Sequence, residues 1–240
     1  MVAAPNLLRH QSVPKFAGLM MFPAMLLGPS LAGVFLTGVV DGRAGLRDLF
    51  SRWRSRFSLR WVCVLLLPPV IMLAVLLGLK TLVSAVYTPN AFVLGIVFGL
   101  PAGFFEEIGW MGFVFPKMRA ANDGLDASVW LGLIWAVWHL PVIDYLGTAT
   151  PHGAYWLPYF LAFASAMTAV RVLITWVYVR TNSLALSQLL HVSSTGSLVV
   201  LSPLRVSAAQ EAFWYAIYGV ALLIVVGIAV GWNRGLGLID

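Results

Sequence analysis

Charged and imidazole side chains stand inside stretches of this sequence that are otherwise apolar. Placing such a group in a bilayer costs about 2.5–3.5 kcal/mol even on scales from insertion experiments, so these groups are usually functional. Thr195 follows His191 by four residues and so lies on the same helical face. The candidate site therefore comprises Glu106, Glu107, His139, Arg171, His191 and Thr195.

The chemistry that these residue types permit is hydrolysis. A carboxylate in surroundings of low dielectric constant can take a proton from water, and nearby imidazoles can stabilise a developing oxyanion. Glu106, His139 and His191 also match the protein ligands of some catalytic zinc sites, which leave one position for water. A bound divalent metal such as zinc and a metal-free, glutamate-activated water are both compatible with the sequence.

Composition indicates what kind of element must position these side chains. The chain has 240 residues, of which 60% are hydrophobic and 10% charged, and its mean hydropathy is +0.90. Because soluble domains carry about 25% charged residues, we expect an all-α, polytopic membrane protein with residues 1–240 in a single membrane domain. Seven stretches are long and apolar enough for transmembrane helices: 16–40, 61–86, 91–116, 127–146, 154–179, 183–201 and 212–232.

The polar groups fall at nearly one level in this predicted arrangement. With a rise of about 1.5 Å per residue from the predicted cytoplasmic ends, the two glutamates lie roughly 14–15 Å deep, His139 and Thr195 about 18 Å, and Arg171 and His191 about 12 Å. Four helices thus place polar side chains in one slab about 6 Å thick. This agreement in depth indicates a single site.

The distribution of Lys and Arg predicts the orientation, since cytoplasmic loops carry an excess of positive charge. Segments 41–60, 117–126, 180–182 and 233–240 hold ten such residues, and the opposite side holds three. We therefore expect the N-terminus outside and the C-terminus in the cytoplasm. His10 and His152 lie outside the predicted spans and are expected to be solvated.

Residues 41–60 form an arginine-rich loop that has the pattern of a short amphipathic helix in the membrane interface. Membrane lipids are the expected partners of its arginines, docking of a substrate or protein partner is the alternative, and nucleic acid is not expected. Cys63 is the single cysteine and excludes a disulfide within the chain. The apolar residues at helical spacing in the loop are Leu46, Leu49, Phe50, Trp53 and Phe57.

The polar residues also carry a family resemblance. EEIGWMGFVFP, ASVWLGLIWAVWHLP and SLALSQLLHVSSTGS resemble, in order, the EExxxR, FxxxH and HxxxN motifs of the CPBP intramembrane proteases. This group includes CAAX prenyl endopeptidases and bacterial abortive-infection or bacteriocin-immunity membrane proteins. The resemblance implies that Glu106 activates a water, that Glu107 supports it, and that His139 and His191 complete the site. Thr195 stands where the family has an Asn that stabilises the oxyanion.

This sequence departs from the family pattern at three positions. Trp135 replaces a Phe, which is an exchange between aromatic residues, and Thr195 keeps only one of the donors of an Asn. Met111 replaces an Arg that would pair with Glu107 four residues earlier on the same helical face. We hypothesise that Arg171, at a similar predicted depth on another helix, supplies the missing positive charge.

The function implied by the resemblance is that of an intramembrane endopeptidase acting on a peptide or lipidated peptide near the cytoplasmic side of a bacterial cell membrane. The departures leave open a catalytically impaired relative that acts as a membrane scaffold or immunity protein. An ion-coupled transporter would also use buried Glu, His and Arg residues, but the chain lacks two matching halves. The substrate, the oligomeric state and any cofactor are not defined by the sequence.

Overall fold

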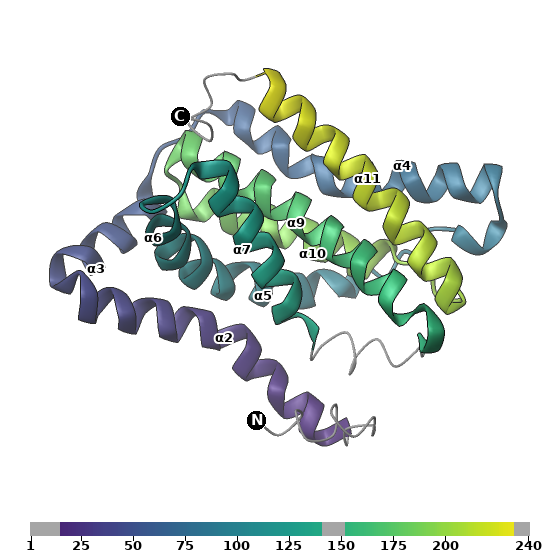
Figure 1. Ribbon diagram of the computed structural model, residues 1–240, viewed down its shortest axis with the longest axis horizontal. Coiled ribbons are helices and arrows are strands. Elements are labelled where there is room, and N and C mark those ends of the chain that lie inside the picture. The colour runs from purple at the N-terminus through teal and green to yellow at the C-terminus, as the bar shows by residue number, and fades with distance from the viewer. Residues whose placement is uncertain (1–14, 141–151, 233–240) are drawn as a thin grey trace.

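A computed structural model of the chain describes residues 15–140 and 152–232 (Figure 1). These residues form helices joined by short connections and contain no strand, so the predicted all-α fold class is confirmed. Within these residues, five helical segments are long and apolar enough to cross a membrane, as expected for a polytopic membrane protein. They are Pro23–Val40, Leu59–Leu82, Gly153–Thr181, Leu184–Leu201 and Ala208–Gly231.

The elements follow one another closely along the chain. The α-helices of the described residues are α2 (Lys15–Val40), α3 (Gly42–Ser51), α4 (Leu67–Leu82), α5 (Ile96–Gly109), α6 (Phe115–Arg119), α7 (Gly124–Trp138), α9 (Trp156–Thr181), α10 (Leu184–Leu201) and α11 (Ala208–Trp232). Short helical turns connect several of them: η1 (Arg52–Arg54), η2 (Leu59–Leu66), η3 (Ala85–Tyr87), η4 (Val93–Gly95), η5 (Trp110–Val114) and η7 (Gly153–Tyr155).

The other two predicted spans differ from uniform transmembrane helices. The stretch 91–116 contains α5 and then the π-helical turn η5, in which the Phe115 amide donates to the carbonyl of Trp110. The stretch 127–146 begins earlier than predicted, because the Asp123 side chain caps α7 by accepting from the Asp126 amide at 2.8 Å. Helix α7 has 15 residues and ends at Trp138, and residues 141–146 lie outside the described part of the chain.

Helix α9 is the central element of the bundle. In its apolar window 72% of the residues are buried, against 28% for the windows of α2 and α11. Figure 1 shows α5, α7, α9 and α10 in the middle of the molecule, α2 on one side, and α4 and α11 on the other. A polar side chain on α9 is therefore enclosed by protein rather than by lipid.

Close helix contacts bring the candidate site together. A Cβ atom on Gly103 of α5 would lie 2.5 Å from the amide nitrogen of Val192 on α10, so only glycine permits this approach. Glu107 is one turn after Gly103, and His191 directly precedes Val192. On the other side, Gly132 of α7 is equally close to the Thr168 backbone of α9, because a Cβ there would be 2.7 Å from the Thr168 Cα.

The arginine-rich loop forms the predicted amphipathic helix as α3, followed by η1. The helix lies at one end of the bundle beside α6 (Figure 1). It also packs against protein, since the Leu49 side chain is fully buried over Gly112 of η5. The amphipathic pattern predicts that the apolar side faces the lipid interface, and this protein contact corrects that expectation for Leu49.

Candidate active site

Glu107 lies at the centre of a buried cluster that joins three helices. Its two carboxylate oxygens accept from Nη1 of Arg171, each at 2.8 Å, and Oε1 also accepts from Nδ1 of His191 at 2.7 Å. Glu107 and Arg171 are fully buried, and His191 is 1% exposed. The structure thus brings together α5, α9 and α10 through one carboxylate, and Arg171 stands where a cation was expected.

Glu106 has different surroundings although it is the adjacent residue. Its Oε2 accepts from the indole nitrogens of Trp135 at 3.1 Å and Trp110 at 3.3 Å. Its Oε1 accepts no hydrogen bond from any residue in 15–140 or 152–232, and no cation within those ranges forms an ion pair with it. The carboxylate is 4% exposed, held by neutral donors through a single oxygen.

Hydrogen bonds define the protonated nitrogen of both histidines. The Nδ1 of His139 is 2.7 Å from the carbonyl oxygen of Trp135, and the Nδ1 of His191 faces the Glu107 carboxylate. Because a carbonyl and a carboxylate only accept, we assign the proton to Nδ1 in each ring. No described residue bonds to Nε2 of either ring, so both atoms are placed to bind a water or a substrate.

Trp135 contacts most members of the cluster, a role that its position in an apolar stretch does not indicate. Besides donating to Glu106, its ring lies edge to face with those of His139 and His191, with centroids 4.9 Å apart in each pair. The guanidinium of Arg171 lies 4.1 Å from its ring centroid, a cation–π contact. A Phe at this position would keep the ring contacts and lose the N–H donor.

Thr195 and Met111 are not joined to these bonds. Thr195 is partly buried on α10, one turn after His191, and its hydroxyl forms no hydrogen bond within the described chain. Met111 is fully buried in η5. Nε and Nη2 of Arg171 are buried and form no hydrogen bond with any residue that the structure describes.

The described residues do not provide a metal site. No group of three His, Cys, Asp or Glu side chains in 15–140 and 152–232 is arranged to hold an ion. The carboxylate of Glu107 is occupied by Arg171 and His191, and one oxygen of Glu106 by two indoles. Among the described residues, Oε1 of Glu106 and Nε2 of His139 and His191 have no hydrogen-bond partner, but the three side chains are not arranged as a group that could hold a zinc ion.

A second set of contacts ties η1 to the helices of the site. Arg52 donates from Nη1 to the Gly112 carbonyl at 3.1 Å and to the Tyr178 hydroxyl at 2.8 Å. Trp53 donates to Oε1 of Gln188 at 2.6 Å, and Gln188 lies three residues before His191. Nε2 of Gln188 donates in turn to the Phe104 carbonyl on α5. Sequence patterns gave no signal for these long-range bonds.

His152 also differs from expectation, since it is buried rather than solvated. Its Nε2 is 3.3 Å from a carboxylate oxygen of Glu211 on α11, and its ring stacks on Tyr159 with centroids 3.8 Å apart. The residue precedes η7 and packs between α9 and α11, which hydropathy alone did not indicate. His10 lies outside the described residues.

The fold and the cluster define a polytopic helical membrane protein with a carboxylate–histidine–arginine site enclosed by its helices. Residues 88–197 match the family model described as type II CAAX prenyl endopeptidase Rce1-like. The matched segment contains all six predicted site residues. The resemblance to the CPBP intramembrane proteases is thereby confirmed.

A curated relative also has a name that refers to CAAX prenyl proteolysis. The chain is 27% identical over 148 residues to CAAX prenyl protease 2 of Methanococcus maripaludis. The alignment covers 54% of this chain and 52% of the relative, so the chain spans about half the length of the curated relative that it matches.

Proposed function

We propose that this chain is an intramembrane endopeptidase in which Glu106 activates the attacking water. The main support is the difference between two adjacent carboxylates. Glu107 is neutralised by Arg171 and bonded to His191, whereas Glu106 is held by indole N–H groups and keeps one oxygen without a partner in the described chain. A buried carboxylate with a free oxygen is suited to general-base catalysis.

In the proposed reaction, Oε1 of Glu106 takes a proton from water while the water oxygen bonds to the scissile carbonyl carbon. The carbonyl oxygen becomes an oxyanion. Collapse of this intermediate breaks the C–N bond, and the proton on Glu106 passes to the leaving nitrogen, which regenerates the carboxylate. The reaction consumes one water for each peptide bond that is cleaved.

The other site residues have supporting roles in this proposal. His191, oriented by Glu107 through Nδ1, donates Nε2–H to the oxyanion when it is an imidazolium. Two carboxylates, Arg171 and this imidazolium then sum to zero charge, which suits a site of low dielectric constant. His139 lines the same space beside Trp135, and the Thr195 hydroxyl supplies one donor where the family has an Asn.

The proposed substrate is a peptide with a prenylated cysteine near its C-terminus, presented near the cytoplasmic side of the membrane. The name of the curated relative and the family description both refer to CAAX prenyl proteolysis. The buried position of the site supports a substrate that enters from the lipid phase.

The experiment compares wild type, Glu106→Gln and Asp126→Asn in liposomes that contain a farnesylated CAAX peptide. Both substitutions convert a carboxylate to an amide, but Asp126 is exposed at the start of α7. We expect Glu106→Gln to lower kcat/KM at least about 100-fold, the usual size of a general-base contribution, and Asp126→Asn to leave it unchanged.

Equal cleavage by wild type and Glu106→Gln would remove Glu106 from the mechanism. Two observations together would instead favour the scaffold or immunity role. The folded wild type would cleave none of these peptides, and Glu106→Gln would support the cellular function as well as the wild type does. Thr195 is the basis of this second function: it stands where the family has an Asn, and no other residue of the described cluster supplies the missing donor. This difference favours the scaffold or immunity role as the second candidate function.

A further inference from the structure

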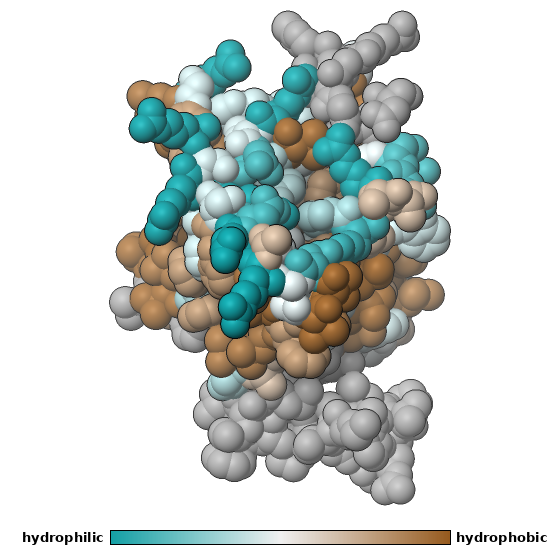
Figure 2. Space-filling model, turned by 90° about the vertical axis from the view of Figure 1, so that its left-hand side faces the viewer, coloured by the Kyte–Doolittle hydropathy of each residue, from teal (hydrophilic) through white to brown (hydrophobic). Residues whose placement is uncertain are grey.

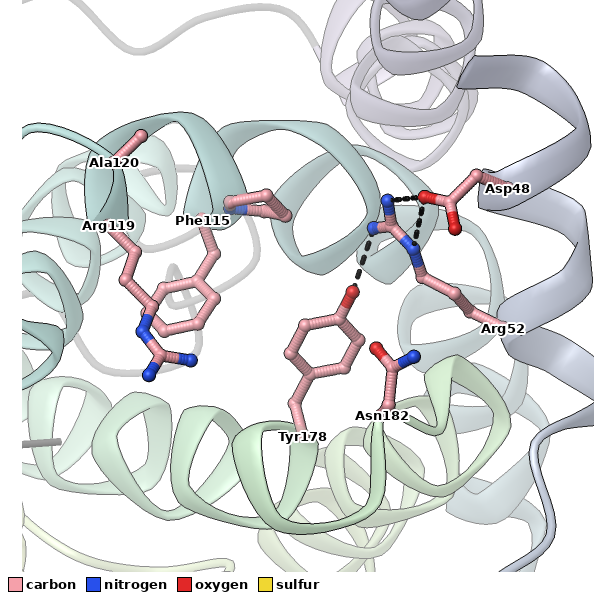
Figure 3. Close-up of a pocket in the computed structure, with 8 residues that line it drawn as sticks. Asp48, Arg52, Phe115, Arg119, Ala120, Tyr178 and Asn182 are labelled. Carbon is pink, nitrogen blue, oxygen red and sulfur yellow. Dashed lines mark hydrogen bonds and ion pairs between the residues drawn. The ribbon is translucent and has the colours of Figure 1, made fainter. Parts of the chain in front are cut away.

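A cavity of about 420 Å³ lies outside the cluster, at the end of the bundle where α3, α6 and α9 meet (Figure 3). Its volume falls within the range of about 300–1,000 Å³ typical of small-ligand sites. Arg52, Arg119, Tyr178 and Asn182 contribute hydrogen-bond donors to its lining, and Asp48 contributes a carboxylate. Two guanidinium groups against one carboxylate make the lining net positive.

Tyr178 presents an unused donor to this cavity. Its side chain is 6% exposed, and its hydroxyl oxygen accepts from Nη1 of Arg52 at 2.8 Å. The hydroxyl proton has no acceptor within the described residues, although a buried O–H group normally finds one. In Figure 3 the hydroxyl points toward the guanidinium of Arg52, at the centre of the labelled residues. A ligand that accepts hydrogen bonds would satisfy it.

The two arginines approach Tyr178 from opposite sides. In Figure 3, Arg119 extends from α6 on one side, and Arg52 lies on the other with its guanidinium between Asp48 and Tyr178. Asp48 bonds to Nε and Nη2 of Arg52 and so fixes the guanidinium in place. Burial alone lowers the pKa of Arg52, but the bonds and charges of Asp48 and Tyr178 raise it above its ordinary value, so the cation persists.

The cavity opens at the polar end of an otherwise apolar molecule. Figure 2 shows hydrophilic side chains gathered at the centre of this face, with hydrophobic ones below and beside them. The apolar helices end here, which places the cavity at the level of lipid headgroups. Guanidinium groups donate strong hydrogen bonds to phosphate oxygens, and a phosphate only accepts when it is fully ionised. Besides its bonds to Asp48, Gly112 and Tyr178, Arg52 keeps one Nη2 hydrogen that no described residue accepts.

From this geometry we infer that the cavity binds a phosphate group through Arg119, Arg52 and the Tyr178 hydroxyl. The group belongs either to the headgroup of an acidic phospholipid or to a soluble phosphate. The inference does not depend on the proposed peptidase activity, because none of the lining residues is in the Glu106–Glu107 cluster.

The test uses the full chain in detergent, with native mass spectrometry to count bound phosphatidylglycerol and phosphatidylcholine supplied in equal amounts. Arg119→Ala removes a cation of the cavity, and Arg54→Ala removes an exposed cation of η1 that does not line it. We expect Arg119→Ala to weaken phosphatidylglycerol binding about tenfold and Arg54→Ala to change it less than about twofold. Tyr178→Phe, which keeps the ring, should weaken it about threefold.

A second arm titrates inorganic phosphate against thermal unfolding of the same variants. Stabilisation of wild type but not of Arg119→Ala, without selective lipid binding, would assign the site to a soluble phosphate. Equal losses in Arg119→Ala and Arg54→Ala would show unspecific attraction to charge and overturn the inference. Absence of any phosphate or phosphatidylglycerol effect in wild type would overturn it as well.

Discussion

Glu106 and Glu107 are neighbours in the chain, but the surrounding helices give their carboxylates opposite electrostatic situations. Helix α9 provides a cation to Glu107 at 2.8 Å, while α7 provides only an indole N–H to Glu106. Removing one partner of a buried ion pair lowers the free energy of unfolding by about 3–5 kcal/mol, because the other charge remains buried and unpaired. Arg171 and Glu107 therefore depend on each other. The division lets one carboxylate hold the site together while the other remains available for chemistry.

An arginine at position 111, where the family motif has one, should be able to replace the positive charge of Arg171. Arg171→Met leaves Glu107 without its cation, and we expect a loss of about 3–5 kcal/mol in unfolding free energy and at least about 100-fold in activity. Met111→Arg in the same chain restores a cation four residues after Glu107, and we expect it to recover at least about tenfold in activity. Peptide cleavage and thermal unfolding measure both effects.

Met111→Arg alone is the control for this exchange, because it adds a second buried cation beside one carboxylate and should be destabilising. Unchanged activity in Arg171→Met would exclude Arg171 as the partner that replaces the motif's Arg. A double variant no better than Arg171→Met would show that the cation must come from α9.

Depth along a helix made the meeting of Arg171 and Glu107 predictable from the sequence. The roles of Trp135 and Trp110 were not predictable, because a tryptophan that packs and one that donates to a carboxylate look the same in an apolar stretch. The direction of an indole N–H depends on how α7 turns toward α5, which is a tertiary property. Pairing Glu106 with two indoles therefore required the structure.

At the scale of elements, glycine contacts determine whether the site assembles. Gly103 allows α5 to reach the backbone of α10 at Val192. Glu107 lies one turn after Gly103 on α5, and His191 directly precedes Val192 on α10, so this close contact lets the two side chains form their hydrogen bond. Hydropathy predicted the helices themselves, since apolar stretches of about 20 residues have few alternatives in a membrane. It did not predict the π-turn η5, because the extra residue leaves the apolar pattern intact.

Gly103→Ala should separate α5 from α10. A Cβ would lie 2.5 Å from the Val192 amide nitrogen, and forcing backbones apart in a packed interior costs about 1–3 kcal/mol. The matched control is Gly78→Ala on α4, where a Cβ meets nothing within 4 Å and alanine favours the helix. We expect Gly103→Ala to lower both the unfolding temperature and cleavage, and Gly78→Ala to lower neither. Equal behaviour of the two variants would contradict this account of the contact.

At the scale of the whole molecule, hydrogen bonds connect the end of the bundle that carries α3 and η1 to the helices of the buried cluster. Helix α3 and η1 carry arginines on the polar face, while Arg52 and Trp53 bond to η5, α9 and α10. The amphipathic pattern predicted where this segment lies but not what it contacts. A hydrogen bond between residues 135 positions apart, as in Trp53 and Gln188, leaves no trace in local periodicity.

The predicted orientation of the molecule in the membrane can be tested with two variants that each carry a single cysteine. The apolar segment Leu59–Leu82 has 24 residues, so at about 1.5 Å per residue it spans about 36 Å and separates Arg54 from Ser84 by a bilayer. Ten basic residues on the side of Arg54 against three on the other predict that Arg54 is cytoplasmic. In a Cys63→Ser background, Ser84→Cys should react with an impermeant maleimide in intact cells, and Arg54→Cys only after permeabilisation. The reverse labelling would invert the orientation and place the cavity of Arg52 and Arg119 on the outer face, where the lipid available to it would differ.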